Sequence, residues 1–205
     1  MGPMGTTATN PVVRLTPPTE PDQLLSEEHA LIRQSKRGDR QAFAVLVERY
    51  WDRLYRWLYH LTHNRHAAED LSQEAFLKAL AGLETFRDGS NFKAWLFRIA
   101  YNGFVNQARK VCRQRDSFPA QVASTAEGPA EQAMSREALQ LLARAVGRLP
   151  DEFKASFLLR VEEGLSFRQI AEVVGTTEET ARWRVFKARQ KLMDVLAPQL
   201  EQEKP

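Results

Sequence analysis

The sequence predicts an all-α protein built from two small helical domains that a flexible linker joins. Apolar residues recur at helical spacing in most segments, and the alternating β-branched runs typical of strands are missing. Residues 114–131 are rich in Ala, Ser, Gln and Pro without apolar periodicity, which is typical of a linker. The predicted organisation is an N-terminal extension without stable structure (1–23), a first domain (24–113), the linker (114–131), a second domain (132–197) and a tail (198–205).

Four helices are predicted in the first domain. The first covers about residues 22–37 and ends at Gly38, because glycine readily adopts the left-handed conformation that stops a helix. Asp39 can cap the second helix, whose apolar residues keep helical spacing up to a break near His63 and Asn64. The remaining elements are a third helix (about 67–81), a loop (82–90) and a fourth helix (about 91–113).

The second domain contains a predicted helix-turn-helix. Ser166, followed three residues later by Gln169, has the capping-box pattern that opens a helix. Gly175 can adopt the positive φ of a tight turn, and Thr176 or Thr177 can cap the helix that follows. This spacing is typical of a helix-turn-helix. The four helices expected in this domain cover about 132–147, 151–162, 167–174 and 178–195.

The last helix of this motif has a predicted outward face that can contact duplex DNA. Its buried stripe is expected to comprise Ala181, Val185, Ala188 and Leu192. Arginine and lysine can meet guanine edges or phosphates, and aromatic carbons can contact thymine methyl groups. An alternative is that Trp183 and Phe186 pack against a neighbouring helix or the other domain. The candidate DNA-binding residues are Thr180, Arg182, Trp183, Arg184, Phe186 and Lys187.

The fourth helix of the first domain combines aromatic, amide and basic side chains. Two apolar stripes flank a polar line made of Arg98, Asn102, Asn106, Arg109 and Arg113. Asparagine offers both a donor and an acceptor to a base edge, and arginine neutralises phosphate. Stacking of an unpaired base on an aromatic ring contributes roughly 1–3 kcal/mol, so such a surface can hold a single strand. The alternative is core packing on both stripes beside a solvated polar line, and for most of these aromatics we expect that alternative.

Charge is distributed unevenly along the chain. The net charge is only +3, but residues 92–115 contain six basic residues and no acid. The preceding stretch is acidic, with Glu69, Asp70, Glu74, Glu84 and Asp88. This asymmetry predicts one surface for nucleic acid and another for a different partner.

Several protein classes are disfavoured by composition. The single cysteine, Cys112, allows no intrachain disulfide, and neither a membrane-spanning run nor a secretory signal is recognisable. His60, His63 and His66 are spaced by three, but the predicted helix break disfavours a metal site. No nucleophile motif or phosphate loop is present. We therefore expect a cytoplasmic protein that is not an enzyme, uses no metal or cofactor and does not insert into membranes.

Two sets of sequence segments resemble a known family. Three segments resemble region two of bacterial sigma factors: the run from Ala68 to Phe76, the pair Phe86-Arg87 and the run from Trp95 to Asn102. Five further segments resemble region four of the same family: the pair Leu149-Pro150 and residues 159–160, 163–166, 169–171 and 182–189. The resemblance is to the small extracytoplasmic-function group, which retains only these two regions, and it covers about residues 24–112 and 132–196 in the family's order.

The resemblance implies three contact surfaces. In the family, the third helix docks on the clamp helices of the largest RNA polymerase subunit, which implies a polymerase-binding role for Asp70, Gln73, Glu74 and Leu77. The loop 82–90 would receive a base flipped from the non-template strand of the −10 element. The residues implied in −10 binding are Phe86, Arg87, Trp95, Arg98, Asn102, Asn106 and Arg109. The last helix of the helix-turn-helix would read the −35 element in the duplex.

The function implied by the resemblance is to bind core RNA polymerase, recognise −10 and −35 elements and promote strand opening, while the polymerase performs the chemistry. The implied partners are the clamp helices and the flap of the core polymerase, promoter DNA and an anti-sigma factor. One alternative is an autonomous helix-turn-helix regulator that binds duplex DNA, usually as a dimer. A second alternative, a nucleic-acid-processing enzyme, would need a carboxylate or nucleophile set that the sequence lacks.

The chain departs from the family pattern at several positions. Trp183 stands where a small residue is usual, and Ala181 where valine is frequent. These changes leave the −35 sequence unpredictable. Asn106 replaces a frequent aspartate, which should make the −10 helix slightly more electropositive.

Overall fold

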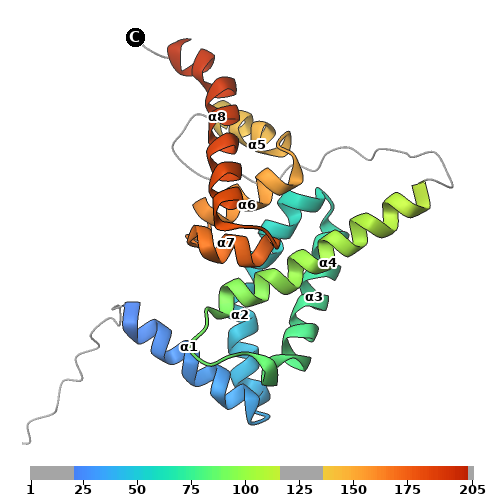
Figure 1. Ribbon diagram of the computed structural model, residues 1–205, viewed down its shortest axis with the longest axis vertical. Helices are drawn as coiled ribbons and strands as arrows, with labels where there is room; N and C mark the ends of the chain where they lie inside the picture. The colour runs from blue at the N-terminus through green and yellow to red at the C-terminus, as the bar shows by residue number, and fades with distance from the viewer. Residues whose placement is uncertain (1–20, 116–135, 203–205) are drawn as a thin grey trace, which may run out of the picture.

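The computed structural model describes residues 21–115 and 136–202 (Figure 1). These residues form eight α-helices and one short 3-10 turn, without a strand. The predicted all-α fold class is therefore confirmed. The N-terminal domain comprises α1 (Pro21–Lys36), α2 (Arg40–Thr62), α3 (Arg65–Ala81), the turn η1 (Leu83–Thr85) and α4 (Phe92–Arg115). The C-terminal domain comprises α5 (Arg136–Gly147), α6 (Asp151–Val161), α7 (Phe167–Val174) and α8 (Glu178–Gln202).

Local capping accounts for the helix ends in the N-terminal domain. The Asp39 side chain accepts hydrogen bonds from the backbone N–H groups of Gln41 and Ala42, so it caps α2 as predicted. His63 adopts a left-handed conformation with φ of 49° and ends the helix, and Asn64 then caps α3. The predicted break between these two helices is therefore confirmed, and its cause is one left-handed residue followed by one capping residue.

The helix-turn-helix has the predicted local geometry. Both halves of the capping box between Ser166 and Gln169 are formed at the start of α7. Gly175 ends α7 with φ of 68°, a left-handed conformation that glycine adopts without steric cost. Of the two candidate threonines, Thr177 caps α8, since its hydroxyl oxygen lies 3.2 Å from the backbone nitrogen of Thr180. The motif is thus fixed by short-range contacts within its own sequence.

Some element boundaries differ from the expected ones. Helix α1 begins at Pro21, inside the extension predicted over 1–23, because proline is favoured in the first turn of a helix, where its missing N–H costs nothing. Helix α8 continues past Pro198 to Gln202, although we expected a tail from residue 198. The residues that follow this proline include Gln, Leu and Glu, all good helix formers. The predicted extension up to residue 20, and the linker from residue 116, lie outside the described residues.

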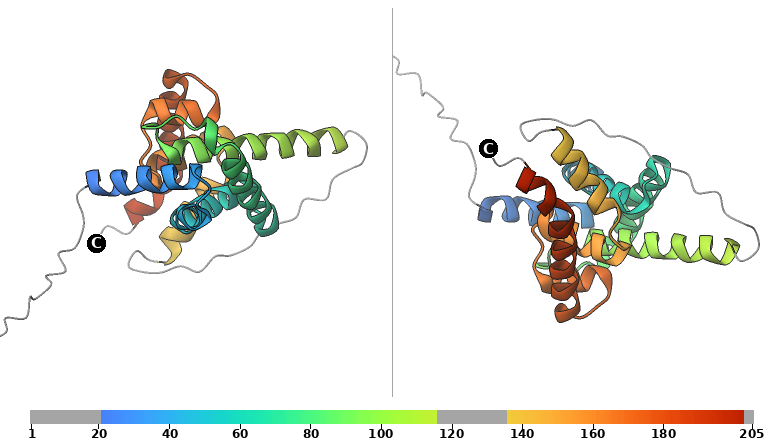
Figure 2. Two further views of the ribbon diagram at one scale, coloured as in Figure 1. Left: turned by 90° about the horizontal axis from the view of Figure 1, so that it is seen from below. Right: turned by 90° about the horizontal axis from the view of Figure 1, so that it is seen from above.

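The two domains pack against each other around α4. This helix lies between α2 and α3 on one side and α7 on the other, and its far end projects beyond the other helices (Figures 1 and 2). Helix α6 also contacts α2. The buried apolar side chains form one continuous cluster that runs from Ile32 in α1 to Leu192 in α8. Within the described part of the chain, no helix has the length and apolar character needed to cross a membrane.

Candidate nucleic-acid interface and partner surface

Helix α3 presents an acidic and apolar face to solvent. Asp70, Gln73 and Glu74 are exposed, whereas the opposite side of the helix is buried in the core. Leu77 lies on the exposed side with 68 % of its surface accessible. Leu80, one turn further on, is 46 % exposed, so two apolar side chains of this helix lie in solvent beside the carboxylates. The four residues predicted to bind a partner are therefore brought together on one helix.

Helix α4 carries the predicted polar line on its exposed side. Arg98, Asn102, Asn106 and Arg109 are all exposed, and Arg113 lies where side chains are not described. The most deeply buried aromatics of the helix are Phe92 and Phe97, which belong to the core cluster. Core packing is therefore the correct interpretation for these rings. The amide and guanidinium groups remain free to meet the edges and phosphates of a nucleic acid.

Phe86, in the loop after η1, is part of the core rather than an exposed ring. Its side chain is 3 % exposed, and its ring centre lies 5.1 Å from that of Trp95 and 5.6 Å from that of Phe92. The Lys36 ammonium donates a hydrogen bond to the Phe86 carbonyl oxygen at 2.6 Å. Trp95 is itself partly buried, and Arg87 is exposed. The Phe86 ring is therefore not available for stacking in solvent, and it can contact a ligand only as part of the lining of a pocket.

A small pocket lies between this loop and α1. It is lined by His29, Ile32, Arg33, Phe86, Asp88 and Gly89. Lys36 hydrogen-bonds to the Asp88 carboxylate and lowers the pKa of that group, which keeps a charged pair beside the pocket. Sequence reasoning missed the contribution of α1, because nothing local links this helix to a loop about fifty residues later.

Helix α8 buries the predicted stripe and exposes the predicted face. Ala181, Val185, Ala188 and Leu192 are all at most 5 % exposed. Phe186 is 61 % exposed, which agrees with the outward orientation. Trp183 is 52 % exposed, and its ring centre also lies 5.3 Å from that of Phe153 in α6. One side of the Trp183 ring therefore packs on a neighbouring helix, as the alternative expected, and the other side meets solvent, so that a contact with DNA stays a prediction.

The charged residues of α8 differ in how freely they can reach a ligand. Arg182 is exposed, and its guanidinium pairs with Glu178 one turn earlier. Lys187 donates to the side-chain oxygen of Gln190 at 2.9 Å. Arg184 is different, because its side chain is only 14 % exposed and is paired with Glu152 of α6. Thr180 bonds to Thr177 at the start of the helix.

Comparison with known proteins identifies both halves of the chain. Residues 46–114 match the family model for Sigma-70 region 2, and residues 139–192 match that for Sigma-70 region 4. The sigma factor SigW of Bacillus subtilis is 32 % identical over 174 residues, which cover 78 % of this chain and 92 % of that protein. The RNA polymerase sigma-H factor of Pseudomonas aeruginosa is 33 % identical over 86 % of this chain and 97 % of that protein.

A solved structure agrees with these relatives. The sigma factor RpoE of Bartonella quintana, solved with the anti-sigma factor NepR, superposes with a TM-score of 0.68 at 31 % identity, over 76 % of this chain and 96 % of that chain. The alternative of an autonomous regulator is not favoured, because it accounts for region four alone and leaves region two unexplained. The chain therefore belongs to the extracytoplasmic-function group of bacterial sigma factors, which bind core RNA polymerase, recognise promoters and start transcription.

Proposed function

We propose that three surfaces of the chain divide the work of a sigma factor. The exposed side of α3 binds the clamp helices of the largest polymerase subunit, the polar line of α4 follows the melted −10 strand, and the outward face of α8 reads the −35 duplex. The C-terminal domain also meets the polymerase flap. The observation that carries this proposal is that α4 and α8 each bury their apolar side and leave amide, basic and aromatic groups exposed.

Strand opening is assigned to α4 and the loop beside it. Asn102 and Asn106 can hydrogen-bond to the edges of unpaired bases, and Arg98 and Arg109 can neutralise the phosphates between them. A base that leaves the duplex must find a site outside the stack, which costs a few kcal/mol unless the protein replaces the lost stacking. The pocket between the loop and α1 is a suitable place for part of that base.

The chemistry of transcription belongs to the polymerase, and we infer that this chain contributes binding alone, without a metal or cofactor, in the cytoplasm. We also propose that an anti-sigma factor holds it inactive. The relative RpoE supports this proposal, because it was solved in complex with the anti-sigma factor NepR.

The first experiment is transcription in vitro with purified bacterial core polymerase on a fragmented genomic library, followed by sequencing of the transcript starts. Starts that require this protein and share upstream motifs are expected, and the motifs would give its promoter. Tight binding to duplex DNA without any dependent start would instead favour a stand-alone regulator.

Two substitutions test the division between the DNA surfaces. Arg182→Ala should weaken −35-dependent complex formation by about tenfold, since one good contact to a base edge is worth roughly 1–3 kcal/mol. Asn102→Ala should leave duplex binding unchanged and slow strand opening, measured with a fluorescent base in the −10 element. Gln107→Ala is the matched control, because Gln107 is exposed on α4 away from the polar line. Equal opening by Asn102→Ala and wild type would contradict the base-binding role.

A further inference from the structure

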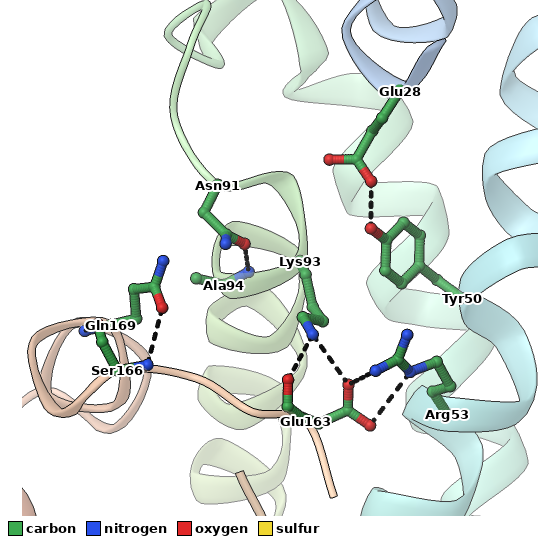
Figure 3. Close-up of polar contacts among 9 residues, drawn as sticks. All are labelled: Glu28, Tyr50, Arg53, Asn91, Lys93, Ala94, Glu163, Ser166 and Gln169. Atoms are coloured by element: carbon green, nitrogen blue, oxygen red, sulfur yellow. Dashed lines mark hydrogen bonds and ion pairs between the residues drawn. The ribbon is translucent and has the colours of Figure 1, made fainter. Parts of the chain in front are cut away.

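Two lysines of the N-terminal domain join segments that are far apart in the sequence. The Lys93 ammonium of α4 lies 3.6 Å from the carboxylate of Glu163, in the turn between α6 and α7, and the Arg53 guanidinium of α2 lies 2.8 Å from the same carboxylate (Figure 3). The Lys36 ammonium of α1 lies 2.7 Å from the carboxylate of Asp88, in the loop that joins η1 to α4 (residues 86–91). The first contact links the two domains. The second lies within one domain, and it reaches a residue that lines the pocket between α1 and the loop.

Lys36 holds this loop at two points. Its ammonium donates one hydrogen bond to the Phe86 carbonyl oxygen at 2.6 Å and another to the Asp88 carboxylate at 2.7 Å. Hydrogen bonds from a charged donor are stronger than neutral ones, and the Lys36 side chain is only 18 % exposed, so water competes with them weakly. One bond fixes the backbone of the loop, and the other fixes a side chain two residues later.

The position of Lys36 is itself fixed by the packing of α1. Ile32, four residues earlier, is 1 % exposed and belongs to the apolar core. Residues four apart lie on the same side of a helix, so Lys36 projects from the side of α1 that faces the core and the loop. The ammonium therefore stands at a defined point relative to the rest of the domain.

The loop is secured at its end but is exposed in its middle. The Asn91 side chain accepts a hydrogen bond from the backbone N–H of Ala94 at 2.8 Å, which fixes the start of α4 (Figure 3). Residues 87–90 are all exposed, and Gly89 has a positive φ of 80°. Glycine has more conformational freedom than any other residue, so this part of the loop would vary in shape without the bond to Asp88.

The shape of the pocket depends on both α1 and the loop. Each contributes three of the six lining residues: His29, Ile32 and Arg33 from α1, and Phe86, Asp88 and Gly89 from the loop. The separation of the two walls is therefore set by the contact that joins α1 to the loop. Groups that recognise a ligand must be held within about 0.5 Å of the productive geometry, because hydrogen bonds weaken steeply outside their normal distances and angles.

We infer that Lys36 is a positioning residue for this pocket: it holds the loop against α1, and the preference of the pocket for one base over the others depends on that contact. This inference rests on the proposed function, in which a base flipped from the −10 strand enters the pocket. Lys36 need not touch DNA. When the loop is in place for only a fraction of the time, the apparent affinity of the pocket for its base falls by that fraction, whereas reading of the −35 duplex by α8 is unaffected.

Three variants of the full chain separate this contact from charge and from stability. Lys36→Met keeps the length of the aliphatic side chain and removes the ammonium, whereas Lys36→Arg keeps a charged donor. Arg37→Met is the matched control, because it removes the same charge from the next residue, which is exposed. Among the described contacts, the Arg37 side chain makes no hydrogen bond or ion pair with the loop.

The test is transcription by core polymerase loaded with each variant, on a library of one dependent promoter in which every −10 and −35 position is varied. Sequencing of the transcripts gives the base preference at each position. Lys36→Met should lower the preference at one −10 position by about tenfold and leave the −35 preferences unchanged. Lys36→Arg should restore most of that preference, and Arg37→Met should behave as wild type.

Two results would overturn the positioning role. The first is a loss of transcription by Lys36→Met that is equal on all members of the library, because a merely structural role lowers stability without changing base preference. The second is an equal change in Arg37→Met, which would show that net charge matters rather than the contact. Asp88→Asn weakens the same pair at a position that is 65 % exposed, so it tests the contact if Lys36→Met folds poorly, and it should relax the same −10 position.

The two proposals fail in different ways. A wild-type chain that gives dependent starts without any base preference in the −10 element would contradict the proposed base site. A wild-type preference that Lys36→Met retains in full would leave that site in place and contradict the role of Lys36 alone.

Discussion

Lys154 is a lysine buried at the boundary between the domains. Only 2 % of its side chain is exposed, and its ammonium lies near His63 and, at 3.5 Å, the carboxylate of Asp151. Both partners are themselves exposed. Burying an ammonium costs several kcal/mol, and an apolar residue of similar volume often replaces a buried charge without loss. The aliphatic part of this side chain therefore accounts for most of its contribution to packing.

We predict that Lys154→Met leaves the free energy of unfolding within about 1 kcal/mol of the wild-type value or raises it. Lys154→Ala should lower it by about 2–4 kcal/mol, because it leaves a cavity. Urea unfolding followed by circular dichroism measures both. A loss with methionine as large as that with alanine would show that the charge, rather than the volume, stabilises this position.

At the scale of the elements, the turn of the helix-turn-helix depends on Gly175. A Cβ atom added there would meet no other atom within 4 Å, so the cost of a side chain comes from the backbone alone. Gly175→Ala should lower the free energy of unfolding by roughly 1–2 kcal/mol, the cost of a left-handed conformation. Gly175→Asn should cost less, because asparagine tolerates this conformation. Chemical denaturation compares the two, and an equal loss would argue against a backbone origin.

Local sequence signals predicted most of the helices, whereas the burial and pairing of side chains that depend on distant residues could not be predicted. Asp39 and Gly175 act over a few residues, so the helix start and the helix end that they set could be placed from the sequence. The helix that Asn64 caps begins at Arg65, two residues before the expected start near 67. Phe86 could not be assigned in this way, because its burial depends on contacts with Trp95 and with Lys36 of α1. The periodicity of α8 identified its buried stripe, but no local rule indicated that Arg184 would pair with Glu152.

At the scale of the whole molecule, domain packing should weaken in mild acid. Burial is the main cause that lowers the pKa of both His60 and His63 below 6.5, and the neighbouring Lys154 acts in the same direction. The packed state therefore favours the neutral rings. Its stability is complete above pH 6.5 and falls as the pH drops through that value, until both rings are also protonated in the packed state. Burial raises the pKa of Glu162, so the packed state favours the protonated form of this carboxyl. Its protonation in acid therefore has the opposite effect on the stability of the packed state.

We predict a lower melting temperature at pH 5.5 than at pH 7.5, measured by differential scanning calorimetry at constant ionic strength. His63→Asn removes one titrating ring and retains a residue that tolerates the left-handed conformation at this position. The difference between the two pH values should be smaller in this variant. The same difference in both proteins would exclude His63 as a contributor.

The packing of the domains was beyond the reach of sequence reasoning. Arg53 and Glu163 are 110 positions apart, and Lys93 and Glu163 are 70 apart, so no periodicity connects them. Glu163 lies beside Gly164 in a turn, where an acid is ordinarily solvated. His63 lies at the predicted helix break, and no local signal there indicates its contact with Lys154 and Gly147 of the other domain. Only the three-dimensional arrangement reveals these contacts.

The shared apolar core also bears on how the chain is made. Synthesis proceeds from the N-terminus at roughly 5–20 residues per second, so α1 to α4 leave the ribosome several seconds before α6 and α7 are complete. During that interval the indole of Trp57 lacks the Ala155 carbonyl that later covers it, and the side of α4 that meets α7 is open to water. The nascent chain thus passes through a stage with more exposed apolar surface than the finished protein, and a chaperone would find its substrate there.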